Sequence, residues 1–130
     1  MTSKILIVED EPDIRDTLNY NFEKEGFKVL SSPDGKSALK LLENNKPDIV
    51  ILDLMLPDMS GLDLCKYLKN DKNFLNTSII MLTAKSEEVD RIVGFELGAD
   101  DYVTKPFSVR ELILRVKVLI KKHTTPENKD

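Results

Sequence analysis

The sequence of 130 residues lacks the residue types on which several kinds of site depend. It contains a single cysteine, Cys65, which excludes an internal disulfide and any metal site built from several cysteines. Because Cys65 falls on a segment that also carries Leu64 and Leu68 at helical spacing, we interpret it as a packing residue. The only histidine, His123, lies near the C-terminus, where we expect it to have no chemical role.

Long apolar runs and an excess of positive charge are also missing. No apolar stretch approaches the roughly 20 residues of a membrane-spanning helix, and no basic segment followed by an apolar one opens the chain. The 19 basic and 23 acidic residues give a net charge of −4, which does not favour nucleic acid or anionic membranes as partners. We therefore expect a soluble, cytoplasmic domain that binds neither nucleic acid nor membrane. The 41% of hydrophobic residues suffice for one compact core.

The chain alternates about five times between strand-like and helix-like stretches, which predicts an α/β fold with helices on both faces of a parallel sheet. The strand-like runs are short and apolar throughout, as is typical of strands buried on both faces. We expect strands near residues 4–9, 27–31, 48–53, 78–83 and 101–104. A single domain over residues 1–122 would then be followed by a tail or the start of a linker at 123–130, which has no apolar face.

Five helices are expected between and after these strands. Pro12 suits a first helical position, Gly26 suits a left-handed C-terminal cap, and Asp34 suits an N-cap. Ser108 and Glu111 have the spacing of a capping box. The expected starting points are Pro12, Gly35, the Ser60-Gly61 pair, Ser86 and Ser108, with ends at Gly26, before Pro47, at Gly98 and near Lys121-Lys122.

Polar side chains stand where four of the expected strands end. Glu9 and Asp10 follow the first strand, Asp53 ends the third, Thr83 ends the fourth, and Lys105 follows the fifth. Ligands in open α/β sheets bind beyond the carboxyl ends of the strands, and right-handed crossovers place the first, third and fourth strand ends side by side. We therefore expect the three acids to converge.

Converging carboxylates favour a bound cation. Two carboxylates about 5 Å apart repel by roughly 3 kcal/mol at an effective dielectric constant near 20, and a third adds to this repulsion. Oxygen ligands without nearby histidine or cysteine favour a hard ion such as Mg²⁺. The alternative is that each acid merely caps the helix that follows it, an explanation that accounts less well for three acids at converging positions.

Lys105 and Thr83 indicate what such a metal would be for. A cation and a hydroxyl facing a Mg²⁺-carboxylate cluster can pair with the oxygens of a phosphoryl group. A carboxylate can itself act as the nucleophile and form an aspartyl phosphate. Asp53 is the best candidate because it ends an apolar strand, and the loop that follows, Leu54-Met55-Leu56-Pro57, can turn a backbone carbonyl toward the metal.

Four segments resemble the receiver domain of response regulators in two-component signalling. They are Val8–Glu11, Leu52–Pro57, Met81–Ala84 and Gly98–Phe107, and the resemblance covers about residues 4–122. It implies a flavodoxin-like, doubly wound sheet of five parallel strands in the order 2-1-3-4-5 with five helices. It also implies a signalling switch rather than an enzyme, with a sensor histidine kinase as partner.

The resemblance assigns a role to each strand-end residue. Asp53 accepts the phosphoryl group, Asp10, Asp53 and the backbone carbonyl of Met55 bind Mg²⁺ directly, and Glu9 binds it through water. Lys105 pairs with a phosphoryl oxygen.

The resemblance also implies a switch. The Thr83 hydroxyl moves toward the phosphorylated aspartate and Tyr102 turns into the vacated space. Pro106 resembles a proline that forms a cis peptide bond with the preceding lysine.

An output surface is suggested by charged residues on the expected fourth helix, fifth strand and fifth helix. Opposite charges on one face can pair across a two-fold axis. The pattern is similar to the dimerisation face of OmpR/PhoB-type regulators, which implies a homodimer on phosphorylation and transcriptional control through a DNA-binding domain absent from this chain. A stand-alone receiver that relays phosphate or docks a partner is the alternative. The residues are Arg91, Glu96, Asp100, Asp101, Glu111, Arg115 and Lys117.

Three other classes of protein fit less well. A phosphatase of the haloacid-dehalogenase type needs a carboxylate two residues after its nucleophile, where this chain has Met55. A flavodoxin needs a donor-rich loop after the first strand, whereas the acids at 9–11 would repel a flavin phosphate. A purely structural domain remains open, and it predicts no response of the acids to Mg²⁺.

Overall fold

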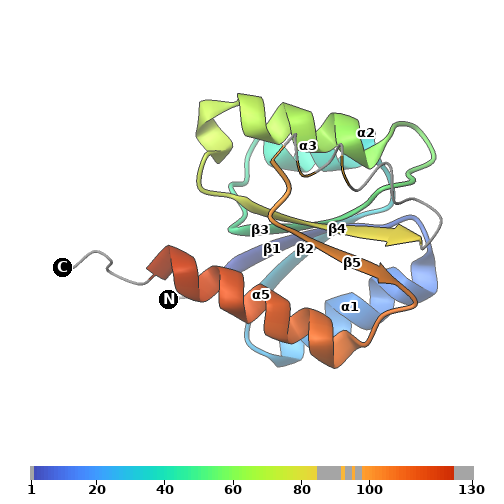
Figure 1. Cartoon of the computed structure of the whole chain (residues 1–130), viewed down its shortest axis with the longest axis vertical. Helices are drawn as coiled ribbons and strands as arrows, with labels where there is room; N and C mark the ends of the chain where they lie inside the picture. Colours follow the sequence, from blue (N-terminus) through green and yellow to red (C-terminus); the bar gives the residue numbers. More distant parts are fainter. Residues whose placement is uncertain (1, 85–91, 93–94, 96–97, 125–130) are drawn as a thin grey trace.

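The computed structural model describes residues 2–84, 92, 95 and 98–124 (Figure 1). Its centre is a sheet of five parallel strands in the order β2-β1-β3-β4-β5. The predicted α/β class and strand order are therefore confirmed, and each strand begins and ends within one residue of the prediction. The strands are β1 Lys4–Val8, β2 Lys28–Ser32, β3 Ile49–Asp53, β4 Ser78–Ala84 and β5 Asp101–Lys105.

Helices cover both faces of this sheet. In Figure 1, α2 and α3 lie on one face, and α1 and α5 lie on the other. The helices are α1 Pro12–Lys24, α2 Gly35–Leu42, α3 Gly61–Asn70 and α5 Val109–Thr124, with a short 3₁₀ turn at Lys72–Phe74. Most of the fourth expected helix, from Ser86 to Gly98, lies outside the described residues.

Alternating side chains of each strand divide the core into two clusters. In β1, Leu6 and Val8 belong to the cluster under α2 and α3, whereas Ile5 and Ile7 belong to the cluster under α1 and α5. All four of these side chains are almost completely buried. Burial on both faces explains why the strands read as continuous apolar runs instead of alternating ones.

Several helix ends follow the expected signals, and two depart from them. Gly26 has a φ of 98° after α1, a conformation that favours glycine, and the Asp34 side chain caps α2. The Ser108 hydroxyl accepts a hydrogen bond from the backbone N–H of Glu111 at 3.2 Å. The Glu111 carboxylate, however, accepts hydrogen bonds from Arg115, so only half of the expected capping box is formed.

Helix α2 is shorter than predicted, because it ends at Leu42 and not just before Pro47. The residues after Leu42 are polar, so they add no apolar face that would hold another turn against the sheet. The Asn45 side chain also donates a hydrogen bond to the carbonyl of Leu41 at 2.8 Å, which satisfies one of the free carbonyls at the helix end.

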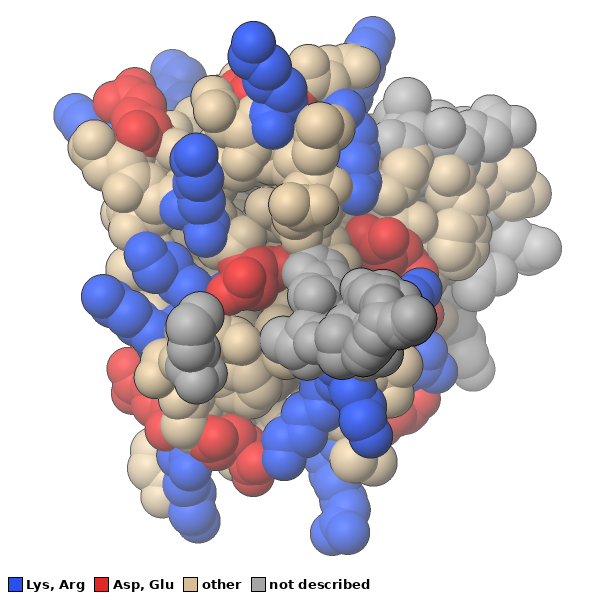
Figure 2. All heavy atoms as spheres, turned by 90° about the vertical axis from the view of Figure 1, so that its left-hand side faces the viewer, with Lys and Arg blue, Asp and Glu red and all other residues tan. Residues whose placement is uncertain are grey.

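The two ends of the sheet differ in chemistry. All strands run in one direction, so their carboxyl ends share one edge, at the right of Figure 1. The opposite end faces the viewer in Figure 2, where the described residues show basic and acidic side chains intermixed. No helix within the described ranges is long and apolar enough to span a membrane. Helix α5 continues to Thr124, so the expected domain boundary at residue 122 falls in its last turn.

Candidate functional site

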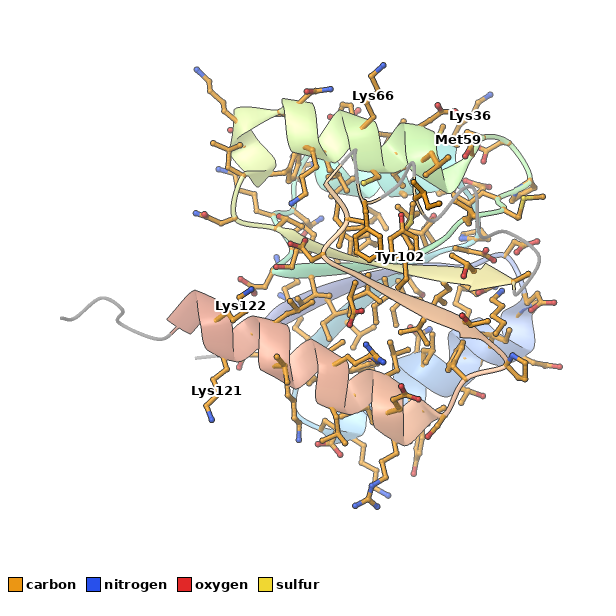
Figure 3. All side chains as sticks on the ribbon, viewed as in Figure 1. Lys36, Met59, Lys66, Tyr102, Lys121 and Lys122 are labelled. Carbon is orange, nitrogen blue, oxygen red and sulfur yellow. The ribbon has the colours of Figure 1, made fainter. Side chains whose placement is uncertain are left out.

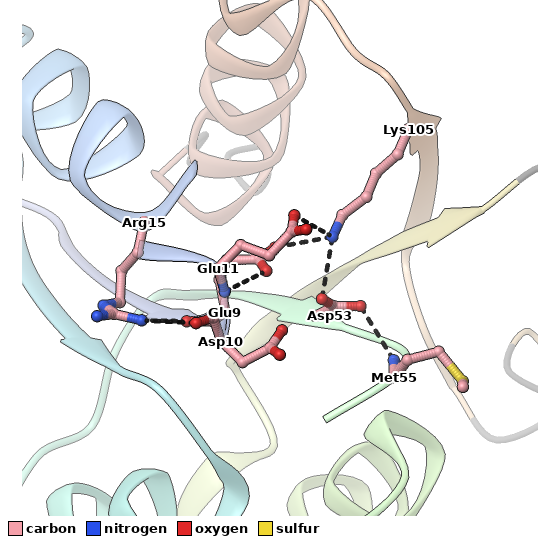
Figure 4. A network of polar contacts seen from close by, with 7 residues as sticks. All are labelled: Glu9, Asp10, Glu11, Arg15, Asp53, Met55 and Lys105. Atoms are coloured by element: carbon pink, nitrogen blue, oxygen red, sulfur yellow. Dashed lines mark hydrogen bonds and ion pairs between the residues drawn. The ribbon is translucent and has the colours of Figure 1, made fainter. Parts of the chain in front are cut away.

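Three acidic side chains meet at the carboxyl edge of the sheet. Carboxylate oxygens of Glu9, Asp10 and Asp53 all lie within 4.8 Å of one another (Figure 4). The sheet explains this arrangement, because β1 pairs directly with β3 and sets Val8 opposite Leu52, one residue before the acids. Glu9 is fully buried and Asp53 is 5% exposed, whereas Asp10 is open to solvent.

The buried Glu9 carboxyl is disfavoured in its charged form. Burial, together with the negative charge of Asp53, raises the pKa of Glu9 to about 7, although a hydrogen bond from the Glu11 backbone N–H and the pairing with Lys105 both act to lower it. Near neutral pH the protein alone therefore holds Glu9 only partly ionised. A cluster of three carboxylates that faces one lysine amine fits a hard divalent cation.

Lys105 reaches into the cluster from the end of β5. Its Nζ lies 3.0 Å from Asp53 Oδ2, 3.1 Å from Glu9 Oε1 and 3.7 Å from Glu11 Oε1. Burial disfavours the charged amine, but the hydrogen bonds to Asp53 and Glu9 outweigh it, so the pKa of Lys105 is raised. The Lys105–Pro106 bond is cis, as expected from the resemblance. Lys105 is thus within ion-pair distance of Glu9, Glu11 and Asp53. Of these three acids, the sequence had not indicated Glu11 as a site residue.

Backbone groups complete the site. The Met55 N–H donates to Asp53 Oδ1 at 3.0 Å, while the Met55 side chain is 63% exposed. The Arg15 guanidinium, on the first turns of α1, donates to the backbone carbonyl of Glu9 at 2.7 Å and to that of Asp10 at 3.4 Å. Arg15 therefore holds the chain that carries two of the acids. No sequence motif indicated a role for Arg15. The only indication in the sequence was its position in the first turn of the helix that follows Glu9 and Asp10.

The Thr83 hydroxyl is buried near the end of β4. Thr83 is 1% exposed, and within the described part of the chain its Oγ1 has no hydrogen-bond partner. The strand register sets Asp53 opposite Leu82, the residue before Thr83. A buried hydroxyl without a partner costs about 1–3 kcal/mol, so this position favours an incoming oxygen atom.

Tyr102, on the neighbouring strand β5, points into the core. The residue is only 8% exposed and belongs to the cluster under α2 and α3, where Figure 3 shows its side chain. Its ring centroid lies 4.3 Å from that of Phe95.

Three of the residues expected on a dimerisation face lie together on β5 and α5. Arg115 Nη1 is 2.9 Å from Asp101 Oδ2, and Arg115 Nη2 is 2.9 Å from Glu111 Oε2. These hydrogen bonds raise the pKa of Arg115. Arg91 and Glu96, from the same expected face, lie outside the described residues.

The other two expected residues make contacts with neighbouring elements. Asp100 Oδ2 accepts a hydrogen bond from the Ile79 backbone N–H at 2.8 Å and lies 3.5 Å from the Lys69 amine of α3. Lys117 forms an ion pair of 2.7 Å with Glu25, at the end of α1. Asp101 therefore lies with Glu111 and Arg115 of α5. Asp100 instead contacts α3, and Lys117 contacts the end of α1.

The chain matches known proteins over almost its whole length. The family model described as the response regulator receiver domain matches residues 5–117. The chain is 50% identical over 122 residues to PhoP of Bacillus subtilis strain 168, the alkaline phosphatase synthesis transcriptional regulatory protein. This match covers 94% of the chain and 50% of PhoP, so the chain spans about half the length of that relative.

Solved structures agree with this match. The receiver domain of TorR, the response regulator of the TMAO respiratory system, is 42% identical with a TM-score of 0.85, covering 92% of this chain and 98% of that one. DrrB of Thermotoga maritima, an OmpR/PhoB homologue, is 34% identical with a TM-score of 0.84, covering 94% of this chain and 54% of that one.

Proposed function

Because this chain belongs to the receiver-domain family of two-component response regulators, we propose that it is a phosphorylated switch with Asp53 as the phospho-acceptor. The observation that carries the proposal is the convergence of Asp53 with two further acids and Lys105 at one sheet edge. Asp53 is the most central of these groups, because one carboxylate oxygen accepts from the Met55 N–H and the other pairs with Lys105. The chain's own chemistry is limited to accepting and releasing this group, so it is a signalling switch and not an enzyme acting on an outside substrate.

In the proposed reaction an oxygen of the Asp53 carboxylate attacks the phosphorus of a phosphohistidine on a sensor histidine kinase. A phosphorus–oxygen bond to Asp53 forms as the phosphorus–nitrogen bond breaks, and the imidazole leaves with the bonding electron pair. Lys105, which already contacts Asp53, pairs with an oxygen of the transferred group. The buried Thr83 hydroxyl donates a hydrogen bond to another of these oxygens.

The acidic cluster is the proposed Mg²⁺ site. Asp10, Asp53 and the Met55 backbone carbonyl would hold the ion directly, and Glu9 would hold it through water. When bound, the ion neutralises negative charge on the carboxylates and on the phosphoryl oxygens. The convergence of three carboxylates beside a single lysine supports the assignment, because their oxygens are the ligands that Mg²⁺ prefers.

The proposed output is a change in the β4–β5–α5 surface. Engagement of Thr83 by the phosphoryl group would draw in the chain after β4, and Tyr102 would adjust within its pocket. The surface around Asp101, Glu111 and Arg115 would then favour a homodimer.

The domain would pass this change beyond α5, which ends at Thr124, to a DNA-binding domain. Such a switch would act in the cytoplasm and control transcription, in keeping with the regulatory name of the PhoP relative.

Intact-mass spectrometry after incubation with acetyl phosphate and Mg²⁺ tests the proposal. The wild type should gain the mass of one phosphoryl group, and Asp53→Asn should gain none. Asp63→Asn is the matched control, since Asp63 is an exposed aspartate of α3 outside the cluster. An adduct on Asp53→Asn, or none on the wild type, would contradict the assignment.

A further inference from the structure

Asp58 joins two loops that are distant in the sequence. Its Oδ1 accepts a hydrogen bond from the Gly35 backbone N–H, and its Oδ2 accepts one from the Lys36 backbone N–H, both at 2.9 Å. These N–H groups open α2, whereas Asp58 lies in the loop between β3 and α3. The two hydrogen bonds hold the pKa of Asp58 below its usual value. A carboxylate that accepts the first two N–H groups of a neighbouring helix makes a directional, charge-assisted contact.

The loop that carries Asp58 also carries Met55, whose backbone carbonyl is a proposed ligand. Its base is narrow: the Gly61 N–H donates to the Leu54 carbonyl at 2.7 Å, and Met55 is bridged to Ser60. A Cβ on Gly61 would lie 2.4 Å from the Asp53 carbonyl oxygen, so the two ends of the loop touch. Because Asp58 and Met55 lie in the same short closed loop, a shift of Asp58 would also displace the backbone of Met55.

The α2 end of this contact is connected to the other acids. The Glu9 backbone N–H donates to the Ser32 carbonyl at 3.0 Å, and the Ser32 hydroxyl donates to the Asp34 carbonyl at 2.7 Å. Gly35, whose N–H donates to Asp58, directly follows Asp34, so this path does not depend on the Asp34 side chain, which caps α2 through a hydrogen bond from the Ser37 N–H. A continuous path of hydrogen bonds and backbone thus leads from Glu9 through the start of α2 to Asp58.

Side-chain packing leaves little room between the two loops. A Cβ on Gly35 would lie 2.4 Å from Met59 Sδ, so a side chain at this position would require the Met59 side chain to shift. In Figure 3 the labelled Met59 and Lys36 side chains both lie on the side of the sheet that α2 and α3 cover. Leu56 and Met59 pack against the core cluster under α2 and α3, and Asp58 adds the polar contact that orients the loop against the helix.

We propose that Asp58 is a positioning residue for the metal site. Its hydrogen bonds to Gly35 and Lys36 fix the Met55 loop against the start of α2, and the start of α2 is connected through Ser32 to the segment that carries Glu9 and Asp10. Asp58 is not itself among the clustered acids, so it acts through the loop and not as a ligand. The inference rests on the proposed function, in which Met55 and the acids share one Mg²⁺.

Mg²⁺ titration followed by amide chemical shifts tests the inference on the intact chain. Asp58→Ala removes both acceptor oxygens, and we expect the dissociation constant for Mg²⁺ to rise about 3- to 10-fold, somewhat less than the 10–100-fold typical of groups that contact a ligand directly. Asp58→Asn removes the same charge but retains one acceptor oxygen, so it should recover part of the loss. In metal-free protein, hydrogen exchange at Gly35 and Lys36 should be faster in Asp58→Ala.

Two control variants separate positioning from other effects. Asp63→Asn removes a negative charge from the neighbouring α3 and should leave the dissociation constant unchanged. Asp34→Ala removes the other cap of α2 and leaves Asp58 in place, so it should weaken Mg²⁺ binding much less than Asp58→Ala.

Three results would overturn the inference. They are an unchanged dissociation constant in Asp58→Ala, an equal loss in Asp34→Ala, and no difference between Asp58→Asn and Asp58→Ala. If wild-type protein bound no Mg²⁺ and gained no phosphoryl group, the proposed function would fail and this inference with it. If the wild type did both and Asp58→Ala bound Mg²⁺ normally, only the role of Asp58 would be lost.

Discussion

Replacement of Glu9 by glutamine should make the metal-free protein more stable at alkaline pH. Glu9 is fully buried beside Asp53, and burial raises its pKa to about 7. The ionised form is therefore less favourable in the folded protein than in the unfolded chain, where the pKa is near 4.5. Folding stability is lost as pH rises from about 4.5 through 7, because the folded state binds the proton more tightly over that range.

The size of this penalty follows from the pKa shift. A pKa raised from 4.5 to about 7 corresponds to about 3 kcal/mol. Burial of the charged form is the largest cause of the shift, and repulsion by the Asp53 carboxylate adds to it. Glutamine keeps an acceptor for the Glu11 N–H but loses the ion pair with Lys105, so the net gain should be about 1–3 kcal/mol at pH 8. At pH values below 4.5 the two side chains are equivalent, and the gain should vanish.

Urea unfolding in a chelating buffer at several pH values measures this difference. Glu23→Gln, at an exposed acid of α1, is the control and should show no pH-dependent gain. In millimolar Mg²⁺ the order should invert, since the wild type retains the full set of acidic oxygens for the ion. A loss of stability in metal-free Glu9→Gln at pH 8, or a gain of equal size at every pH, would refute the electrostatic reasoning.

Three further variants probe other parts of the site. Lys105→Met should bind Mg²⁺ nearly as well as the wild type yet dimerise less at equal phosphorylation, as sedimentation can show; normal dimerisation would remove Lys105 from the switch. Gly61→Ala should cost about 3 kcal/mol in urea unfolding, because its Cβ would lie 2.4 Å from a backbone oxygen that cannot move freely, and a neutral result would mean that the β3–α3 loop adapts. Arg115→Ala should stay monomeric in sedimentation with Mg²⁺ and beryllofluoride, a phosphoryl mimic, under conditions that dimerise the wild type; a variant that dimerises equally would exclude this arginine from the interface.

The fold and the acidic cluster could be predicted because both depend on rules that operate along the backbone. Strands buried on both faces leave continuous apolar runs, so β1, β3 and β4 were recognisable from their composition. Once the strands are parallel, topology alone brings their carboxyl ends together, and Glu9, Asp10 and Asp53 meet without further information.

Contacts that depend on side-chain direction were not predictable. Asp58 reaches the start of α2 across 22 and 23 positions, and Lys117 reaches Glu25 across 92. No spacing pattern in the sequence indicates either contact, because each forms only once whole helices and loops have packed against one another. The Glu111 side chain had two local partners, Ser108 and Arg115, and the guanidinium offered two donors where the backbone offered one.

The central claim is that the phosphoryl group is attached to Asp53. Reduction with borohydride after treatment with acetyl phosphate and Mg²⁺ converts an aspartyl phosphate into homoserine, and peptide mass spectrometry then identifies the residue. We predict homoserine at position 53 alone, and none when Mg²⁺ is removed by a chelator. Homoserine at Asp10 or at another acid, with Asp53 intact, would contradict the proposed function.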